Sequence, residues 1–265
     1  MNPEPLPAVD DGRAAADALL DALALPASTH VGSRVPKALL AENGAATAAD
    51  RRLLTAGVEE LRWTHTVKPT TAGVPAFHDG TRDYLEIAVL RLTARDTPHL
   101  QRLFELVHRA VPYPVVLVTE AGSTVSLSLV HKRAALNEAG RVVLDGDPAR
   151  ATLAPDTAAE TRRAFLAALP LALQPRASLF TLYQGWIDTA RAFEAATVAG
   201  GFTLPASAEH AEARRQALAD LARLDAEIAA VRRAAQKEKQ VARRADLNLR
   251  LSRLRTDRQA ALDAL

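Results

Sequence analysis

The sequence predicts an α/β fold, with a mixed sheet and flanking helices, followed by a helical region and a long C-terminal helix or coiled coil. Three observations lead to this fold class. Short runs of β-branched residues alternate with segments of helical period as far as residue 155. Residues 156–204 have helical spacing alone. Residues 206–265 contain neither Gly nor Pro, and one helix of that length would extend roughly 90 Å.

These changes of pattern divide the chain into four parts. We expect an N-terminal arm over residues 1–30, a mixed α/β domain over 31–155, a helical region packed on it over 156–204, and the long helix or coiled coil over 205–265. Acidic residues interrupt the apolar run of the arm, so it does not resemble a secretory signal.

The α/β domain is expected to begin with a helix whose N-cap is Thr47, three residues before Asp50. Strands are expected at 61–67, 84–92, 115–118, 124–130 and 141–144. A helix ending near Ala110 separates the second strand from the third, which implies a parallel pair with a right-handed crossover. Alternation along the strands predicts a buried set that comprises Leu85, Ile87, Val89, Val115, Leu117, Leu127 and Leu129.

The C-terminal segment carries two apolar seams that are out of register with each other. The first comprises Leu221, Leu224, Ile228, Val231 and Ala235, and the second Leu247, Leu251, Leu254, Ala261 and Leu265. Either a stutter or a fold-back into a helical hairpin would explain the change of register. Because no Gly or Pro marks a turn, one long helix is favoured, and its seam would need a second surface from a partner or another copy.

Composition excludes several classes of function. The chain has no Cys, so it has no disulfide, thiolate metal site or Cys nucleophile, in agreement with the reducing cytoplasm that we expect as its location. It has no uncharged apolar stretch of membrane-spanning length. It also lacks the Walker, GxGxxG, HExxH and GxSxG motifs, so no cofactor and no metal site is expected, and an enzyme is less expected than a binding protein.

The net charge of +2 conceals an uneven distribution of charge. Residues 228–258 hold ten basic residues and three acidic ones. The candidates for phosphate or partner contacts are the cations where the two seams lose register, namely Arg232, Arg233, Lys237, Lys239, Arg243 and Arg244. They could contact DNA phosphates, meet an acidic protein surface, or form an ordinary solvated face. No aromatic residue follows Phe202, which argues against base stacking on this segment.

A second group of candidate cations ends the 124–130 strand. His131, Lys132 and Arg133 follow one another and could bind a phosphate or a partner's carboxylate. Helix capping explains His108 and Arg109 without a ligand, since cations are favourable at a helix C-terminus.

Acidic residues near the 84–92 strand provide an alternative, enzymatic interpretation. Asp83 and Glu86, with Lys68 three residues beyond His65, could form a divergent metal-dependent nuclease site. The common nuclease pattern places a Lys two residues after the second acid, where this chain has Ala88. The competing interpretation is that Asp83 caps a strand and Glu86 faces solvent or pairs with a basic residue.

Several residue strings resemble a bacterial family that is known only as a domain of unknown function. The strings are PKALL at 36–40, RWTH at 62–65, DYLEI at 83–87, HRAVPYP at 108–114, SLSLVHKR at 126–133 and YQGW at 183–186. Genes of that family often lie near SNF2-type helicases and DNA methyltransferases in restriction or phage-defence islands. The resemblance implies a helicase or methyltransferase as the larger partner, and it carries over no catalytic residue.

Taken together, these patterns favour a non-catalytic accessory subunit that engages a partner protein, and perhaps DNA phosphates, through its C-terminal helix. Self-association through that helix is the other form of partnership that the seams permit. The nuclease built on Asp83 and Glu86 is kept as the alternative.

Overall fold

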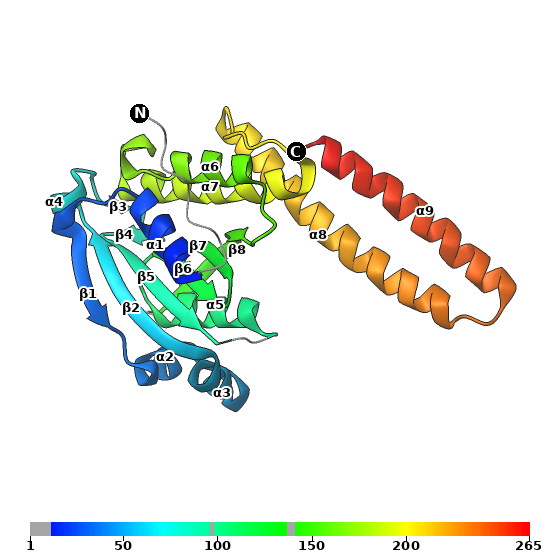
Figure 1. Ribbon diagram of the computed structural model, residues 1–265, viewed down its shortest axis with the longest axis horizontal. Coiled ribbons are helices and arrows are strands. Elements are labelled where there is room, and N and C mark those ends of the chain that lie inside the picture. Colours follow the sequence, from blue (N-terminus) through cyan, green and yellow to red (C-terminus); the bar gives the residue numbers. More distant parts are fainter. Residues whose placement is uncertain (1–11, 96–97, 137–140) are drawn as a thin grey trace. The chain divides into compact units, whose positions relative to one another are not determined.

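A computed structural model gives the structure of residues 12–95, 98–136 and 141–265, and the chain divides into two compact units, Met1–Ala190 and Arg191–Leu265. The first unit is built on a six-stranded mixed sheet with the strand order β1-β2-β5-β6-β7-β8 (Figure 1). Helices flank this sheet and long helices end the chain. The predicted fold class is therefore confirmed.

Every neighbouring pair of strands in the sheet is antiparallel except β5 and β6, which are parallel. The strands are β1 (His30–Arg34), β2 (Val58–Val67), β5 (Ile87–Ala94), β6 (Val115–Ala121), β7 (Thr124–Ala134) and β8 (Val142–Leu153). A separate small ribbon pairs β3 (Phe77–His78) with β4 (Asp83–Tyr84). The last strand runs nine residues beyond its expected end, and the short, exposed β1 was not expected from the sequence at all.

The helix α5 (Leu100–Ala110) connects the two parallel strands and covers one face of the sheet. Its apolar side meets Leu90 and Leu117, which are cross-strand neighbours on that face. The helices α2 (Lys37–Gly44) and α3 (Ala48–Gly57) pack beside it. The Thr47 hydroxyl accepts the Asp50 amide at 3.1 Å, so the predicted N-cap of α3 is confirmed.

The opposite face of the sheet carries α1 (Gly12–Ala22). Residues alternate between faces along a strand, so Arg91 points away from α5. Its guanidinium pairs with Asp17 of α1 and donates to Glu120 of β6, the latter at 2.5 Å. This three-residue network attaches the N-terminal helix to the middle of the sheet.

One residue of the predicted buried set is exposed. Leu85 is 60% exposed, whereas the other members of the set, from Ile87 to Leu129, are fully buried. The expected strand over 84–92 is in fact two strands, because β4 ends at Tyr84 and β5 begins at Ile87. Leu85 lies at the junction between them, where the alternation of the long strand does not apply.

The helical stretch after the sheet comprises α6 (Ala159–Ala168), a 3₁₀ turn (Leu171–Leu173) and α7 (Leu179–Ala199). Tyr183 and Trp186 of α7 are fully buried. The Tyr183 hydroxyl accepts the Val130 amide at 3.0 Å and lies 2.7 Å from the Val115 carbonyl, while the Trp186 indole donates to the Leu169 carbonyl at 2.9 Å. These two aromatic residues are therefore core residues and do not form a stacking surface.

The C-terminal segment is a helical hairpin, which corrects the expectation of one long helix. It consists of α8 (Ala208–Lys237) and α9 (Val241–Asp263), which lie side by side and run in opposite directions (Figure 1). The two seams that are out of register along the sequence pack against each other, with Leu224, Val231, Leu251 and Leu254 buried between the helices. The seam therefore has its second surface within the same chain and does not require a partner.

Truncation of Ile87 to Ala tests the placement of the central strand. Ile87 is fully buried at the start of β5, so removing its side chain should lower the free energy of unfolding by about 2–5 kcal/mol. The matched control is Leu85→Ala, two residues away and exposed, for which a change within about 0.5 kcal/mol is expected. Urea unfolding followed by circular dichroism measures both, and equal effects of the two substitutions would contradict the placement.

Candidate phosphate-binding tip

The six cations that the sequence analysis selected lie at the closed end of the hairpin. There α8 ends at Lys237, three residues turn the chain, and α9 begins at Val241. The turn is closed locally, because the Glu238 carboxylate accepts the Gln240 amide at 2.8 Å. We call these residues the tip, defined as Arg232, Arg233, Lys237, Lys239, Arg243 and Arg244.

All six side chains of the tip are exposed, and none forms an ion pair within the described part of the chain. Two other arginines of the hairpin differ. Arg258 donates to Asp225 across the two helices at 2.5 Å, and Arg250 pairs with Glu227 in the same way. Cross-helix ion pairs therefore neutralise these two arginines, whereas the six cations of the tip, like Arg253 and Arg255, are exposed and have no ion pair within the described residues.

The start of α9 opposes the usual electrostatics of a helix N-terminus. Its N-cap, Gln240, makes no side-chain capping bond, and its first turn contains no acidic residue. Arg243 and Arg244 stand there instead, although the partial positive charge of a helix N-terminus favours anions. The unpaired amides and the two guanidinium groups together create a positive end that a bound anion would stabilise.

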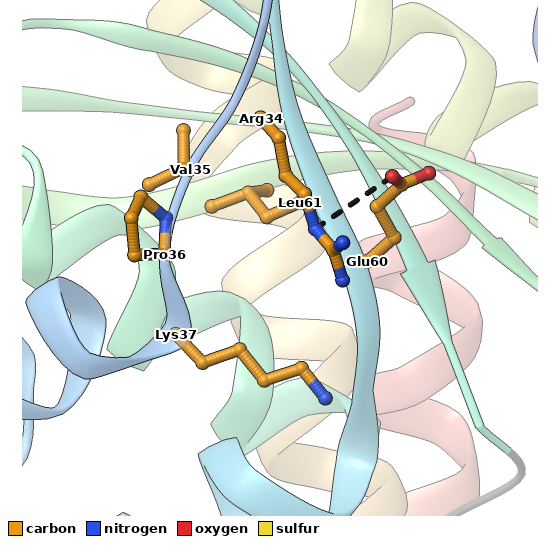
Figure 2. Close-up of a pocket in the computed structure, with 6 residues that line it drawn as sticks. All are labelled: Arg34, Val35, Pro36, Lys37, Glu60 and Leu61. Carbon is orange, nitrogen blue, oxygen red and sulfur yellow. Dashed lines mark ion pairs between the residues drawn. The ribbon is translucent and has the colours of Figure 1, made fainter.

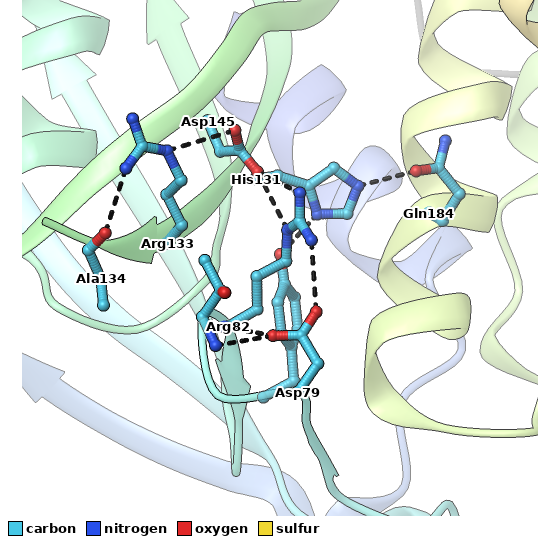
Figure 3. Close-up of polar contacts among 9 residues, drawn as sticks. Asp79, Arg82, His131, Arg133, Ala134, Asp145 and Gln184 are labelled. Carbon is cyan, nitrogen blue, oxygen red and sulfur yellow. Dashed lines mark hydrogen bonds and ion pairs between the residues drawn. The ribbon is translucent and has the colours of Figure 1, made fainter. Parts of the chain in front are cut away.

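The structure does not bring His131, Lys132 and Arg133 together as a cluster of cations. His131 lies among aromatic rings, with Phe180 stacked at 4.8 Å, and its Nε2 atom is 2.7 Å from the Gln184 amide oxygen (Figure 3). Gln184 donates through its nitrogen to Asp188 at 2.8 Å, which fixes its oxygen as the acceptor. His131 therefore donates from Nε2 to Gln184, and its Nδ1 shares a hydrogen bond with the Tyr84 hydroxyl.

Arg133 belongs to a separate network of charges. Asp145 lies between two guanidinium groups, at 3.6 Å from Arg133 and 2.7 Å from Arg82, and Arg82 also pairs with Asp79 at 3.2 Å (Figure 3). Backbone amides of Arg82 and Thr81 donate to Asp79, and they lower the pKa of that carboxyl. This network closes the loop between β3 and β4 onto β8.

Lys132 is buried, with 3% of its surface exposed, on the face of β7 opposite to His131. Its amine donates to the carbonyl oxygens of Val111 and Tyr113, the latter at 2.5 Å, where α5 ends. Burial lowers the pKa of Lys132 to about 7. Burial also lowers the pKa of the neighbouring His108, which shares a 3.0 Å hydrogen bond with Ser128. Lys132 therefore satisfies carbonyl oxygens that follow α5, and His108 connects the last turn of α5 to β7.

The carboxylates of the alternative nuclease site contact different partners. Asp83 is exposed and lies 2.5 Å from the His78 ring, whereas Glu86 is largely buried and pairs with Lys68 at 3.1 Å. Lys68 thus forms an ion pair with Glu86, whereas Asp83 contacts His78. Among the residues that the structure describes, no group of three or more His, Asp or Glu side chains could hold a metal ion.

Two cavities lie on the α/β unit. The smaller, of about 340 Å³, is lined by residues 34–37 together with Glu60 and Leu61, and an Arg34–Glu60 ion pair of 3.8 Å lies beside it (Figure 2). The larger, of about 750 Å³, lies between the C-terminal ends of α2 and α5 and the start of β8. The larger cavity is lined by Arg109 and Arg141 together with Glu42, and Arg109 is already paired with Glu105 at 2.5 Å.

Sequence reasoning missed the polar chain from Tyr84 through His131 and Gln184 to Asp188. Its members come from three elements that are far apart in the sequence. The only signal for it was three of the family strings, which contain Tyr84, His131 and Gln184, and none of them has a spacing that indicates a contact.

Substitution of Lys132 by Met tests whether the buried amine titrates near neutral pH. In the unfolded chain the pKa is about 10.4, so between pH 7 and pH 10 the unfolded state binds a proton that the folded state lacks. Stability of the unsubstituted protein should therefore rise with pH in that window, by up to about 1.4 kcal/mol per pH unit relative to the variant. The neutral amine retains two N–H donors for its two carbonyl acceptors.

The variant itself should be less stable by about 1–3 kcal/mol, because the two carbonyl oxygens lose their donor. Urea unfolding at several pH values from 6.5 to 9.5 measures the effect, with the exposed Lys239→Met as control. If the free energy of unfolding changes with pH in the same way for the Lys132 variant and the unsubstituted protein, the amine has an ordinary pKa and its predicted titration near pH 7 is wrong.

Comparison with known proteins places the chain in one family. Within the described residues, no helix combines the length and the apolar character that crossing a membrane requires. No curated protein and no solved structure matches the chain. The model of the family described as "Domain of unknown function (DUF4391)" matches residues 23–257, which is most of the chain. The protein therefore belongs to the DUF4391 family.

Proposed function

We propose that this protein is a non-catalytic accessory subunit that binds the phosphate backbone of nucleic acid through the tip of its helical hairpin. The observation that carries this proposal is the group of six exposed cations without acidic partners in the described structure. By contrast, Arg250 and Arg258 of α9 are paired with acids of α8. Phosphate is a common ligand for clustered guanidinium and ammonium groups.

The hairpin presents these cations on a support that needs no partner to fold. Its apolar seam is buried internally, and cross-helix ion pairs hold the two helices together. A preorganised group of cations loses less conformational freedom on binding than a disordered basic tail. The chain has no aromatic residue after Phe202, so the contacts expected are to phosphates and not to stacked bases.

The geometry around the acidic residues supports the accessory role over the nuclease alternative. The acids of the alternative nuclease site are held by different partners, and no observation favours that activity. In this proposal the protein works in the cytoplasm and brings nucleic acid to a larger DNA-processing enzyme of a defence system, such as a helicase or methyltransferase. The resemblance of the residue strings to a family encoded near such enzymes supports that partner class.

Reversal of two charges at the tip tests the proposal. If about six phosphates are contacted, the logarithm of the association constant should fall with the logarithm of salt concentration with a slope near −5. Arg243→Glu with Arg244→Glu should make the slope shallower, at about −4 or closer to zero. The double substitution should also weaken binding to unrelated duplexes by the same factor. Fluorescence anisotropy with labelled 20-base-pair duplexes from 50 to 200 mM salt measures both quantities.

The matched control is Arg253→Glu with Arg255→Glu, which makes the same change of net charge on the same helix. Both control residues are exposed and lie away from the tip. Binding should be reduced much less in the control than in the tip variant. Equal losses in the two variants, or no binding at tens of micromolar protein in 50 mM salt, would overturn the proposal and leave an acidic protein surface as the partner.

A further inference from the structure

The strand β1 leaves one edge of the six-stranded sheet open. It is the first strand in the sheet order, and among the described residues only β2 pairs with it. All five of its residues, His30–Arg34, are exposed. The unpaired N–H and C=O groups of an edge strand are a template on which another chain can add a strand. The open edge of β1 is therefore a surface for an extended segment of another chain.

The last part of β1 directs its free backbone groups outward. The register shift of β1 against β2 lies before Ser33, and beyond it Arg34 stands regularly opposite Arg62. The next residue, Val35, donates its amide to the Leu61 carbonyl at 2.8 Å, so its backbone groups point into the sheet. Successive residues of an antiparallel strand direct these groups to opposite sides. The N–H and C=O of Arg34 therefore point away from β2, where an added strand would meet them.

Two guanidinium groups share one carboxylate beside this open edge. Arg34 and Arg62 form a non-hydrogen-bonded cross-strand pair, in which side chains lie closest, and like charges in that arrangement are unfavourable. Within the described chain both pair with the same acid, Glu60, at 3.0 Å from Arg62 and 3.8 Å from Arg34. The Arg34 side chain is 67% exposed. An acidic side chain on an added strand would be its cross-strand partner and would compensate the second positive charge.

The other face of this edge provides an apolar contact. Val35 packs toward the core beneath α5, and the alternation of a strand places it on the face opposite to Arg34. The cavity of about 340 Å³ that begins there has Val35, Pro36 and Leu61 as its apolar lining (Figure 2). On an added strand, the residue next to the acidic one would direct its side chain toward this cavity. An apolar side chain suits that position.

We infer that the β1 edge is the docking surface for an extended segment of a partner protein in which an acidic residue adjoins an apolar one. Strand addition obtains affinity from main-chain hydrogen bonds and specificity from contacts of alternate side chains. Here the backbone of Arg34 provides the first, and its guanidinium and the cavity at Val35 provide the second. The inference rests on the accessory role proposed above, but β1 and the tip belong to different compact units.

Binding of designed peptides to the full chain tests the inference. The probe is a fluorescein-labelled peptide with the core Val-Glu-Val-Glu-Val, which as a strand presents acids on one face and apolar groups on the other. We expect saturable binding with a dissociation constant of about 100 µM or tighter, measured by anisotropy. The amide signals of residues 33–35 should shift in ¹⁵N–¹H correlation spectra. Replacing Glu by Lys in the peptide, or N-methylating its alternate amides, should weaken binding about tenfold or more.

Charge reversal on the protein provides the complementary test. Arg34→Glu should weaken binding of the acidic peptide by about tenfold and strengthen binding of the Lys peptide. The matched control is Arg52→Glu, the same change at an exposed position of α3, which should leave peptide affinity unchanged. Circular dichroism checks that both variants fold. Arg34→Glu should also leave the salt slope of duplex binding unchanged, so the inference and the proposed function fail separately.

Four results would overturn the inference. They are no saturable binding at about 1 mM peptide, equal affinity for the acidic and Lys peptides, amide shifts that lie away from β1, and peptide binding that Arg34→Glu leaves intact. Self-association of the chain that Arg34→Glu abolishes would also contradict it, because a second copy would then be the occupant of the edge.

Discussion

The parallel pairing of β5 with β6 is the constraint on which the α/β unit depends. Two adjacent parallel strands need a crossover connection, and here α5 provides it. The crossover helix covers one face of both strands, α1 packs on β6 and β7 at the other face, and β5 is buried along nearly its whole length. Arg91 is the polar exception, and its pairing with Asp17 and Glu120 shows how the sheet accommodates a charge under a helix.

The same crossover explains why the amine of Lys132 is buried. The carbonyl groups at the end of α5 must be satisfied inside the protein, because β7 lies beside them. The amine of Lys132 reaches them from the sheet and remains a donor whether or not it is protonated. His131, the next residue back along β7, points to the other face and joins Tyr84 and Gln184. Consecutive residues therefore take part in separate networks, as the pleat of a strand requires.

The sequence predicted those parts of the fold that have a local periodic signal. The strand–helix–strand unit around Phe104, the N-cap Thr47 and both hairpin seams could be recognised because each pattern is contained within a short stretch. The short edge strand β1 could not, since its five residues are all exposed and have no apolar alternation. Leu85 was misplaced because the strand pattern continues across the break between β4 and β5.

The candidate functional residues also differ in whether a local sequence pattern indicated them. The tip cations were identified from local charge alone, but the hairpin that gathers them depends on a turn that contains neither Gly nor Pro. The two out-of-register seams were the signal for that turn, because helices that fold back on each other need no common register along the chain. The polar chain from Tyr84 through His131 to Gln184 joins three elements that are far apart in the sequence, so no spacing along the chain indicated it.

The arginines of α9 differ in whether an acid of α8 lies opposite them. Arg250 and Arg258 lie opposite acids of α8, so their charges support the fold. Arg243 and Arg244 stand in the first turn of α9, which contains no acidic residue and where the helix dipole disfavours cations. A sequence selected only for hairpin stability would place acids there, as α3 does with Asp50 in its first turn. This unfavourable placement at one end of the hairpin is the ground for the proposal that the tip binds an anionic ligand from outside the chain.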